Sequence, residues 1–177
     1  ALPISDIASQ AGRLGIQGVD NIEEFTRVTS KMAVATDLAA GEAADAFARI
    51  DDEKITDRSH VYEPDFVIVQ DKSLIEYVDV TEGLDADGTL LINTSTEPEE
   101  LDIETEADVV TVDATEIALE HLGRPIMNTS LLGAFSRISG LVELESIEEV
   151  IMKEFPGSIG EKNVAASTAA YQEVPAV

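Results

Sequence analysis

Three glycines near the start of the chain form the first pattern whose spacing could do chemistry. Gly12, Gly15 and Gly18 recur every third residue, and a helix is expected from residue 19 onward. Glycines between a strand and a helix let backbone N–H groups approach phosphate oxygens at the helix N-terminus. Leu14 and Ile16 add Cβ atoms to the same loop, which favours a structural turn. A lone glycine pattern is a weak signal, so ligand loop and plain turn both stay open.

Two Asn-Thr pairs form the second candidate. Asn93-Thr94 follows an expected strand, and ligands of open parallel sheets settle beyond the carboxyl ends of their strands. Asn128-Thr129 stands where a helix is expected to begin. For both pairs, hydrogen bonds to local backbone in a loop or cap are the favoured alternative to ligand binding. Asp71 and Asp113 also end strands, and we expect both to cap helices.

The residue types needed for catalysis are missing or isolated. His60 and His121 have no metal-ligating partner at useful spacing, and Ser130 lacks the G-x-S-x-G context of an activated serine. The sequence has no cysteine, which excludes a disulfide, a thiolate nucleophile and a Cys-ligated iron–sulfur cluster within this chain. We therefore predict no catalytic residue and no metal site.

The charge is strongly negative. Thirty-six acids stand against eleven lysines and arginines, for a net charge of −25. This balance argues against binding to nucleic acid or to an anionic membrane surface. The acids are spread along the chain, which favours a solvated surface adapted to high salt, that is, a halophilic origin. An acidic docking face for a basic partner is the alternative. The sequence shows no export signal and no membrane-spanning run, so we expect a cytoplasmic protein.

Apolar patterning predicts a single α/β domain over residues 1–177, with a mainly parallel sheet, helices on both faces and a Rossmann-like order. Strands are expected at 43–50, 65–69, 89–93 and 109–112, and an exposed acidic connection at 94–108. Helices are expected at 19–40, 73–80, 114–122, 128–139, 146–154 and 159–173. The pairs Asp113–Glu116, Ser146–Glu149 and Ser158–Glu161 have capping-box spacing.

The stretch 113–135 is the most informative part of this pattern. Gly123 is expected to end a helix, and Arg124-Pro125 to form a rigid turn. A second helix then starts near Asn128-Thr129, whose side chains could cap it. Gly133 and Ala134 predict close packing of this second helix against the sheet or a partner subunit.

Five segments resemble the gamma subunit, or gamma domain, of the 2-oxoacid:ferredoxin oxidoreductases. They are AFARIDDEKI (46–55), YEPDFVIVQDKSLIE (62–76), GLDADGTLLINT (83–94), DATEIALEHLGRPIMNTSLLGAF (113–135) and LESIEEVIMKEFPGSIGEKNVAASTAAYQEV (144–174). The runs LGRPIMNTSLLGAF and EKNVAASTAAY are the most specific. The resemblance spans about three quarters of the chain.

This resemblance implies a non-catalytic gamma component of a multi-subunit enzyme that oxidatively decarboxylates pyruvate or another 2-oxoacid to acyl-CoA. Coenzyme A would be the co-substrate, and ferredoxin would accept the electrons without direct contact with this chain. Thiamine diphosphate, Mg and iron–sulfur clusters would lie in partner alpha, beta and delta subunits or domains. The alternatives are a free-standing Rossmann-like small-molecule binding module, or a structural subunit with no ligand site.

Within that enzyme, the chain could help position coenzyme A. The glycine-rich loop of the family matches this sequence at Gly12, Arg13, Gly15, Gln17 and Gly18, and departs from it at Leu14 and Ile16. The predicted cofactor-binding residues are those five together with Asn93, Thr94, Asn128 and Thr129.

Overall fold

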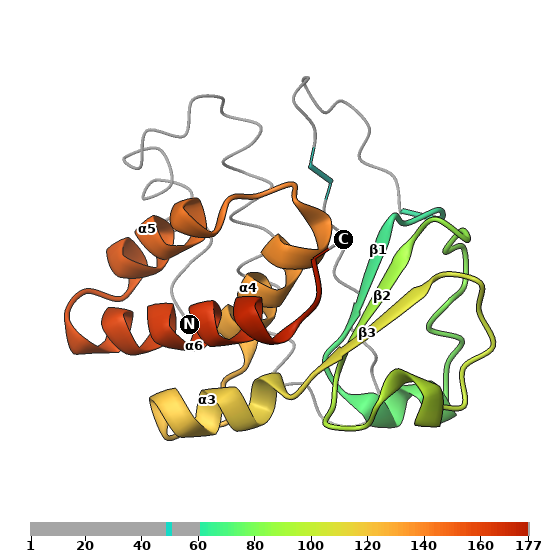
Figure 1. Cartoon of the computed structure of the whole chain (residues 1–177), viewed down its shortest axis with the longest axis horizontal. Coiled ribbons are helices and arrows are strands. Elements are labelled where there is room, and N and C mark those ends of the chain that lie inside the picture. The colour runs from blue at the N-terminus through green and yellow to red at the C-terminus, as the bar shows by residue number, and fades with distance from the viewer. Residues whose placement is uncertain (1–48, 51–60, 177) are drawn as a thin grey trace. The chain divides into compact units, whose positions relative to one another are not determined.

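The computed structural model describes residues 49–50 and 61–176 of the 177-residue chain (Figure 1). All described helices and strands belong to one compact unit, Tyr62–Val177. The glycine loop 12–18, the helix expected at 19–40 and most of the strand expected at 43–50 lie outside the described residues. Arg49 and Ile50 have no regular secondary structure. The prediction of a single domain over residues 1–177 stays a prediction.

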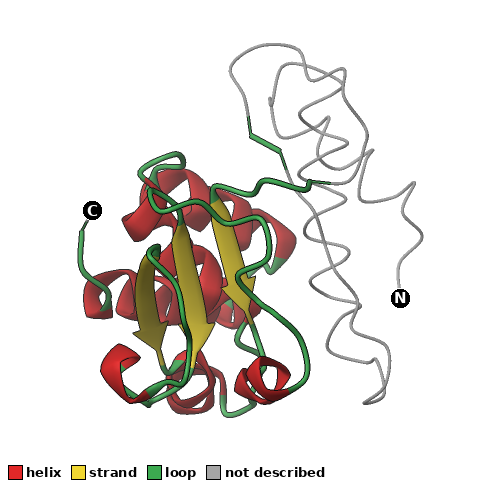
Figure 2. Cartoon of the chain, turned by 90° about the vertical axis from the view of Figure 1, so that its right-hand side faces the viewer, coloured by secondary structure: helices red, strands yellow, loops and turns green. Residues whose placement is uncertain are grey.

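A three-stranded parallel sheet organises this unit (Figures 1 and 2). Its strands are β1 (Phe66–Val69), β2 (Thr89–Asn93) and β3 (Asp108–Val112), in the order β1-β2-β3. In the central strand Thr89, Leu90, Leu91 and Ile92 are all buried. This continuous apolar run is typical of a parallel strand covered on both faces. The strands expected at 65–69, 89–93 and 109–112 are confirmed to within one residue.

Four α-helices follow the sheet along the chain: α3 (Ala114–Leu122), α4 (Asn128–Ser139), α5 (Leu144–Glu154) and α6 (Ser158–Glu173). Two short 3-10 helices lie in the connections between strands, η1 (Lys72–Glu76) and η2 (Pro98–Glu100). The α/β class with a parallel sheet is confirmed. The helix expected at 73–80 is shorter than predicted, because the backbone N–H of Tyr77 bonds to the Leu74 carbonyl and closes η1.

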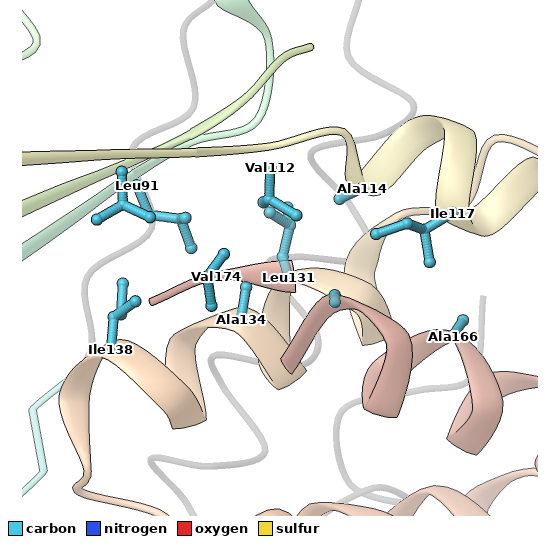
Figure 3. Packing of buried hydrophobic residues seen from close by; sticks show 11 residues of the cluster. Leu91, Val112, Ala114, Ile117, Leu131, Ala134, Ile138, Ala166 and Val174 are labelled. Atoms are coloured by element: carbon cyan, nitrogen blue, oxygen red, sulfur yellow. The ribbon is translucent and has the colours of Figure 1, made fainter. Parts of the chain in front are cut away.

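Each face of the sheet has its own apolar core. On one face, sheet residues pack with α3, α4 and α6; labelled examples in Figure 3 are Leu91, Val112, Leu131, Ala134 and Ala166. On the other face, Val69, Leu90 and Ile92 pack with apolar side chains of η1 and of the connections, among them Leu74 and Ile103. Thus α-helices cover one face, and 3-10 turns with irregular chain cover the other. The acids of the connection 94–108 are all exposed, as predicted, while Leu101 and Ile103 between them pack on this face of the sheet.

Helices α4 and α6 approach each other very closely. A Cβ atom added to the buried Gly133 would overlap the backbone carbonyl of Ser167 in α6. Neighbouring Ala134 instead belongs to the core shared with the sheet. The close packing predicted at this pair therefore exists, but Gly133 contacts a helix of the same chain. The prediction that this pair packs against the sheet or a partner subunit thus holds for Ala134, which packs toward the sheet, while Gly133 packs against α6.

The observed helix ends confirm one predicted cap and differ from several others. Asp113 caps α3, since its Oδ1 accepts a hydrogen bond from the Glu116 N–H at 2.9 Å, and Gly123 ends that helix with φ +69°. Helices α5 and α6 begin earlier than expected, at Leu144 and Ser158. The capping boxes at Ser146–Glu149 and Ser158–Glu161 are wrong because Glu143 and Gly157 occupy the cap positions without side-chain cap bonds. Side-chain capping of α4 by Asn128-Thr129 is also wrong, since Met127 is the N-cap residue.

Candidate functional site: the carboxyl edge of the sheet

Polar side chains gather where the three parallel strands end. Asn93, the last residue of β2, donates from Nδ2 to the Gln70 carbonyl after β1 and to Thr115 Oγ1 in α3, both at 2.9 Å. Its Oδ1 accepts from the Thr115 backbone N–H at 3.2 Å. One amide therefore joins the ends of two strands to the first turn of α3. These bonds use both donors of the Asn93 amide, which limits what it can offer a ligand.

The next residues along the chain extend this polar edge toward solvent. Thr94 Oγ1 lies 3.1 Å from Thr96 Oγ1 and accepts from the Thr96 N–H at 3.1 Å. Thr96 Oγ1 in turn accepts a hydrogen bond from the exposed Lys72 Nζ at 2.9 Å. Lys72 belongs to η1, so this bond links the segments that follow β1 and β2. The outer part of the edge thus presents one ammonium group and two hydroxyls.

Sequence reasoning missed Lys72, although a signal was present. It is the single Lys or Arg between Arg58 and Arg124, a stretch rich in acids, and it comes directly after Asp71. Asp71 was correctly expected as a cap: its Oδ1 accepts from the Ser73 N–H at 2.9 Å. A cation that follows a parallel strand so closely lies at the edge where ligands of parallel sheets bind.

The pair Asn128-Thr129 lies at the start of α4 and serves a different set of contacts. Thr129 is buried and donates from Oγ1 to Asn163 Oδ1 of α6 at 2.9 Å. Asn163 Nδ2 then donates to the Ile159 carbonyl at 2.8 Å. Thr129 therefore fastens α4 to α6, while Asn93 fastens the sheet edge to α3. Ligand binding by either pair stays a prediction.

The described residues offer little chemistry for proton transfer or metal binding. Within these ranges no group of three or more His, Cys, Asp or Glu side chains could hold a metal ion. His121 lies in the last turn of α3. Thr81 donates from Oγ1 and from its backbone N–H to Asp79 Oδ1, and these bonds hold the pKa of this exposed carboxyl below its usual value. The carboxyl edge of the sheet can hold the connections between strands in place and present the Lys72 ammonium group.

The class of protein follows from these features and from comparison with known proteins. The family described as pyruvate ferredoxin/flavodoxin oxidoreductase matches residues 36–173. Pyruvate synthase subunit PorC of Methanocaldococcus jannaschii is 50% identical over 129 residues, covering 73% of this chain and 70% of that protein. A Pyrococcus furiosus protein, the pyruvate/ketoisovalerate oxidoreductases common subunit gamma, is 46% identical over 136 residues, covering 75% of this chain and 74% of that protein.

A solved structure agrees with these sequence relatives. The crystal structure of pyruvate oxidoreductase subunit PORC from Thermotoga maritima matches with a TM-score of 0.61 and 40% identity, over 64% of this chain and 65% of that one. The chain thus belongs to the pyruvate ferredoxin/flavodoxin oxidoreductase family, and within it to the gamma-type subunits. Its partners are other subunits of a multi-subunit oxidoreductase. In the described part of the chain, no helix has the length and apolar character to cross a membrane.

Proposed function

We propose that this chain is the non-catalytic gamma component of an enzyme that oxidatively decarboxylates pyruvate or a related 2-oxoacid to its acyl-CoA. The observation that carries the proposal is the 50% identity to an archaeal pyruvate synthase subunit, across 70% of that subunit's length. The composition supports a non-redox role for this chain, because its 177 residues include no cysteine to bind a cluster.

The proposal assigns the cofactors to other subunits. Thiamine diphosphate with Mg would lie in alpha and beta subunits and supply the carbanion chemistry of decarboxylation. Iron–sulfur clusters would lie in a delta subunit and pass electrons to ferredoxin. The residues of this chain do not fit these groups: cysteine is absent from the sequence, and the described residues contain no metal-binding cluster of acids and histidines. Its own contribution is a rigid α/β unit that braces the assembly.

Coenzyme A is the one small molecule that we propose this chain contacts. The predicted contact is the loop of Gly12, Arg13, Gly15, Gln17 and Gly18, which lies outside the described residues. At the carboxyl edge of the sheet, Lys72 is the side chain best suited to an anionic group, because Asn93 is engaged in holding the edge together.

The choice of 2-oxoacid is proposed to lie outside this subunit. The name of the Pyrococcus furiosus relative describes a gamma subunit common to pyruvate and ketoisovalerate oxidoreductases. A component shared between two such enzymes would not select between their substrates. By analogy, this chain would support whichever oxoacid its catalytic partners accept.

Native purification of the tagged chain from its own cells tests the proposal. We expect cysteine-bearing and thiamine diphosphate-binding subunits to co-purify in fixed ratio, as measured by mass spectrometry. The assembly should oxidise pyruvate or another 2-oxoacid with coenzyme A, while the isolated chain is colourless and inactive. A chain that purifies alone, or that oxidises a 2-oxoacid alone, would contradict the proposal.

A further inference from the structure

One end of the described unit exposes several large apolar side chains. They are Leu119, Ile126, Met152, Phe155 and Ile159, which come from the α3–α4 turn, the α5–α6 turn and the helix ends beside them. Ile159 is 62% exposed and Ile126 is 46% exposed. Scattered single apolar residues on a surface need no explanation, but a group at one place marks an interaction site.

The two segments that carry these side chains, residues 119–129 and 152–163, lie next to each other. Thr129 at the end of the first donates a hydrogen bond to Asn163 at the end of the second. Helix α3 also packs against α6. Figure 1 shows the last turn of α3 and the α5–α6 connection at the same end of the unit, away from the sheet. We call these two segments the neutral end, because their acids and bases are equal in number.

The backbone of both turns is fixed, so the apolar side chains are held outward. Gly157 between α5 and α6 has φ +76°, a conformation that favours glycine. A Cβ atom on Gly160 would overlap the Phe155 carbonyl, which shows how tightly this turn is closed. In the other turn, the Ile126 N–H donates to the Arg124 carbonyl at 2.8 Å, across Pro125. The exposure of Phe155 and Ile126 is thus built into the turns.

The charge of this end differs from that of the rest of the unit. Residues 62–177 carry twenty-five acids and five bases. The neutral end holds three of those bases, Arg124, Lys153 and Lys162, and only three acids, so its net charge is zero. All of the excess negative charge of this unit therefore lies elsewhere. A surface that must meet another protein benefits from such local neutrality, since like charges at an interface oppose association.

We propose that the neutral end is the surface by which this chain docks onto another subunit of the oxidoreductase. The surface it fits is apolar at its centre, with carboxylates at its rim to face Arg124, Lys153 and Lys162 and with bases to face the three acids of the neutral end. A second copy of this chain would bring a surface of the same zero net charge, but with the same large negative charge behind it, so the two copies would repel each other. A different subunit need not carry that charge. The inference rests on the proposed function, because it needs a multi-subunit enzyme.

Glutamate substitutions of the two most exposed aliphatic residues of the neutral end test this surface. Ile159→Glu and Ile126→Glu place a carboxylate where the apolar centre of the contact would be. Leu141→Glu is the matched control, because Leu141 is an aliphatic residue, 54% exposed, in the α4–α5 connection outside the neutral end. Each tagged variant is co-produced with the other subunits, and the subunits recovered with it are quantified by native mass spectrometry. Thermal unfolding and sedimentation of each isolated chain are measured alongside.

We expect both neutral-end variants to unfold at the wild-type temperature and to recover partner subunits at least about tenfold less well, the loss that a removed interface anchor typically causes. Leu141→Glu should assemble as the wild type does. Equal recovery for all three variants would overturn the surface assignment while leaving the proposed function intact. Failure of the wild type itself to recover partners would instead refute the proposed function. If the wild-type chain forms a dimer that Ile159→Glu dissociates, the neutral end binds a second copy of this chain and not a partner subunit. If either neutral-end variant unfolds at a much lower temperature than the wild type, this chain covers its own neutral end. Either result overturns the proposal.

Discussion

The two faces of the sheet are covered in contrasting ways. Helices α3, α4 and α6 cover one face through small residues, and no acid occurs between His121 and Val142. The other face is covered by η1, η2 and irregular connections, and the sequence from Gln70 to Asp108 holds thirteen acids and one base. Close packing between helices therefore characterises the helical face, whereas irregular chain with solvated charge covers the apolar core of the other, which we call the acidic face. Substitutions should reveal this difference.

The largest effect is expected at the α4–α6 contact. Gly133→Ala places a methyl group against the Ser167 backbone carbonyl, which cannot move without shifting α6. Gly133→Leu would overpack the contact further. We expect a loss of about 3 kcal/mol or more for either, because overpacking outweighs the gain of about 1 kcal/mol from replacing a helical glycine. Urea unfolding monitored by circular dichroism measures the change.

Gly88→Ala is the matched control on the acidic face. Gly88 is also buried, but its added Cβ would overlap the flexible tip of the Leu84 side chain, and the nearest backbone atom, the Asp85 carbonyl oxygen, would lie 3.1 Å away. The Leu84 side chain can rotate, so a much smaller loss is expected. Equal losses for Gly88→Ala and Gly133→Ala would mean that the two faces tolerate added volume alike.

An intermediate effect is expected at the polar edge that joins the two faces. Asn93→Asp removes the donor to the Gln70 carbonyl and to Thr115, and places a charge in a half-buried position. We expect a loss of about 1–3 kcal/mol at pH 7, the usual result of leaving a buried polar group without its partner. Gln172→Glu, an exposed amide changed to an acid in α6, controls for the added charge and should change stability little. If the two variants have the same urea midpoint, the hydrogen bonds of Asn93 contribute nothing to stability.

Salt should stabilise the chain by screening its acids, thirteen of which lie in the segment that covers the acidic face. At 0.01 M salt, charges interact over about 30 Å, and at 1 M over about 3 Å, so KCl reduces the self-repulsion of a chain with net charge −25. We expect the thermal midpoint to climb between these concentrations. An equal osmolality of sucrose controls for effects other than screening. A flat or falling midpoint in KCl would favour the acidic docking face over adaptation to high salt.

The smallest effect is expected at the exposed Asp79–Thr81 turn. The hydrogen bonds from Thr81 lower the pKa of Asp79, so their contribution to stability is present above its ordinary pKa and is lost as the pH falls through the lowered value. Thr81→Ala removes the side-chain donor and should raise the pKa of Asp79 toward its ordinary value. Carboxyl carbon NMR titration detects this shift. An unchanged titration midpoint would show that the hydroxyl bond does not form in solution.

Most of the described fold could be predicted because its signals are local. The strand sequence TLLIN, the cap at Asp113 and the stop at Gly123 each act within a few residues, and all three features appear where expected. The contact between Gly133 and Ser167 joins positions far apart in sequence, so the small residues signalled close packing without naming the neighbour. The cap errors at α5 and α6 share a cause: Ser146 and Ser158 match a motif, but helices that begin one or two residues earlier leave them inside the first turn.

The candidate site was less predictable. Asn93 was correctly placed at the carboxyl edge of the sheet, but its three hydrogen bonds go to Gln70 after β1 and to Thr115 in α3, so they depend on the register of β1 against β2. Lys72 passed unnoticed because a single lysine matches no motif. Its significance depends on Thr96, which the fold brings within 2.9 Å across twenty-four residues of sequence.

Omission and add-back of this chain would test its role as a non-catalytic but required component most directly. The remaining subunits are prepared without it, and 2-oxoacid oxidation with coenzyme A and a ferredoxin acceptor is measured as the purified chain is added. The account predicts little activity without the chain, a rise that saturates at a fixed ratio of chain to assembly, and no activity from the chain alone. Full activity before any addition, or turnover by the chain alone, would contradict it.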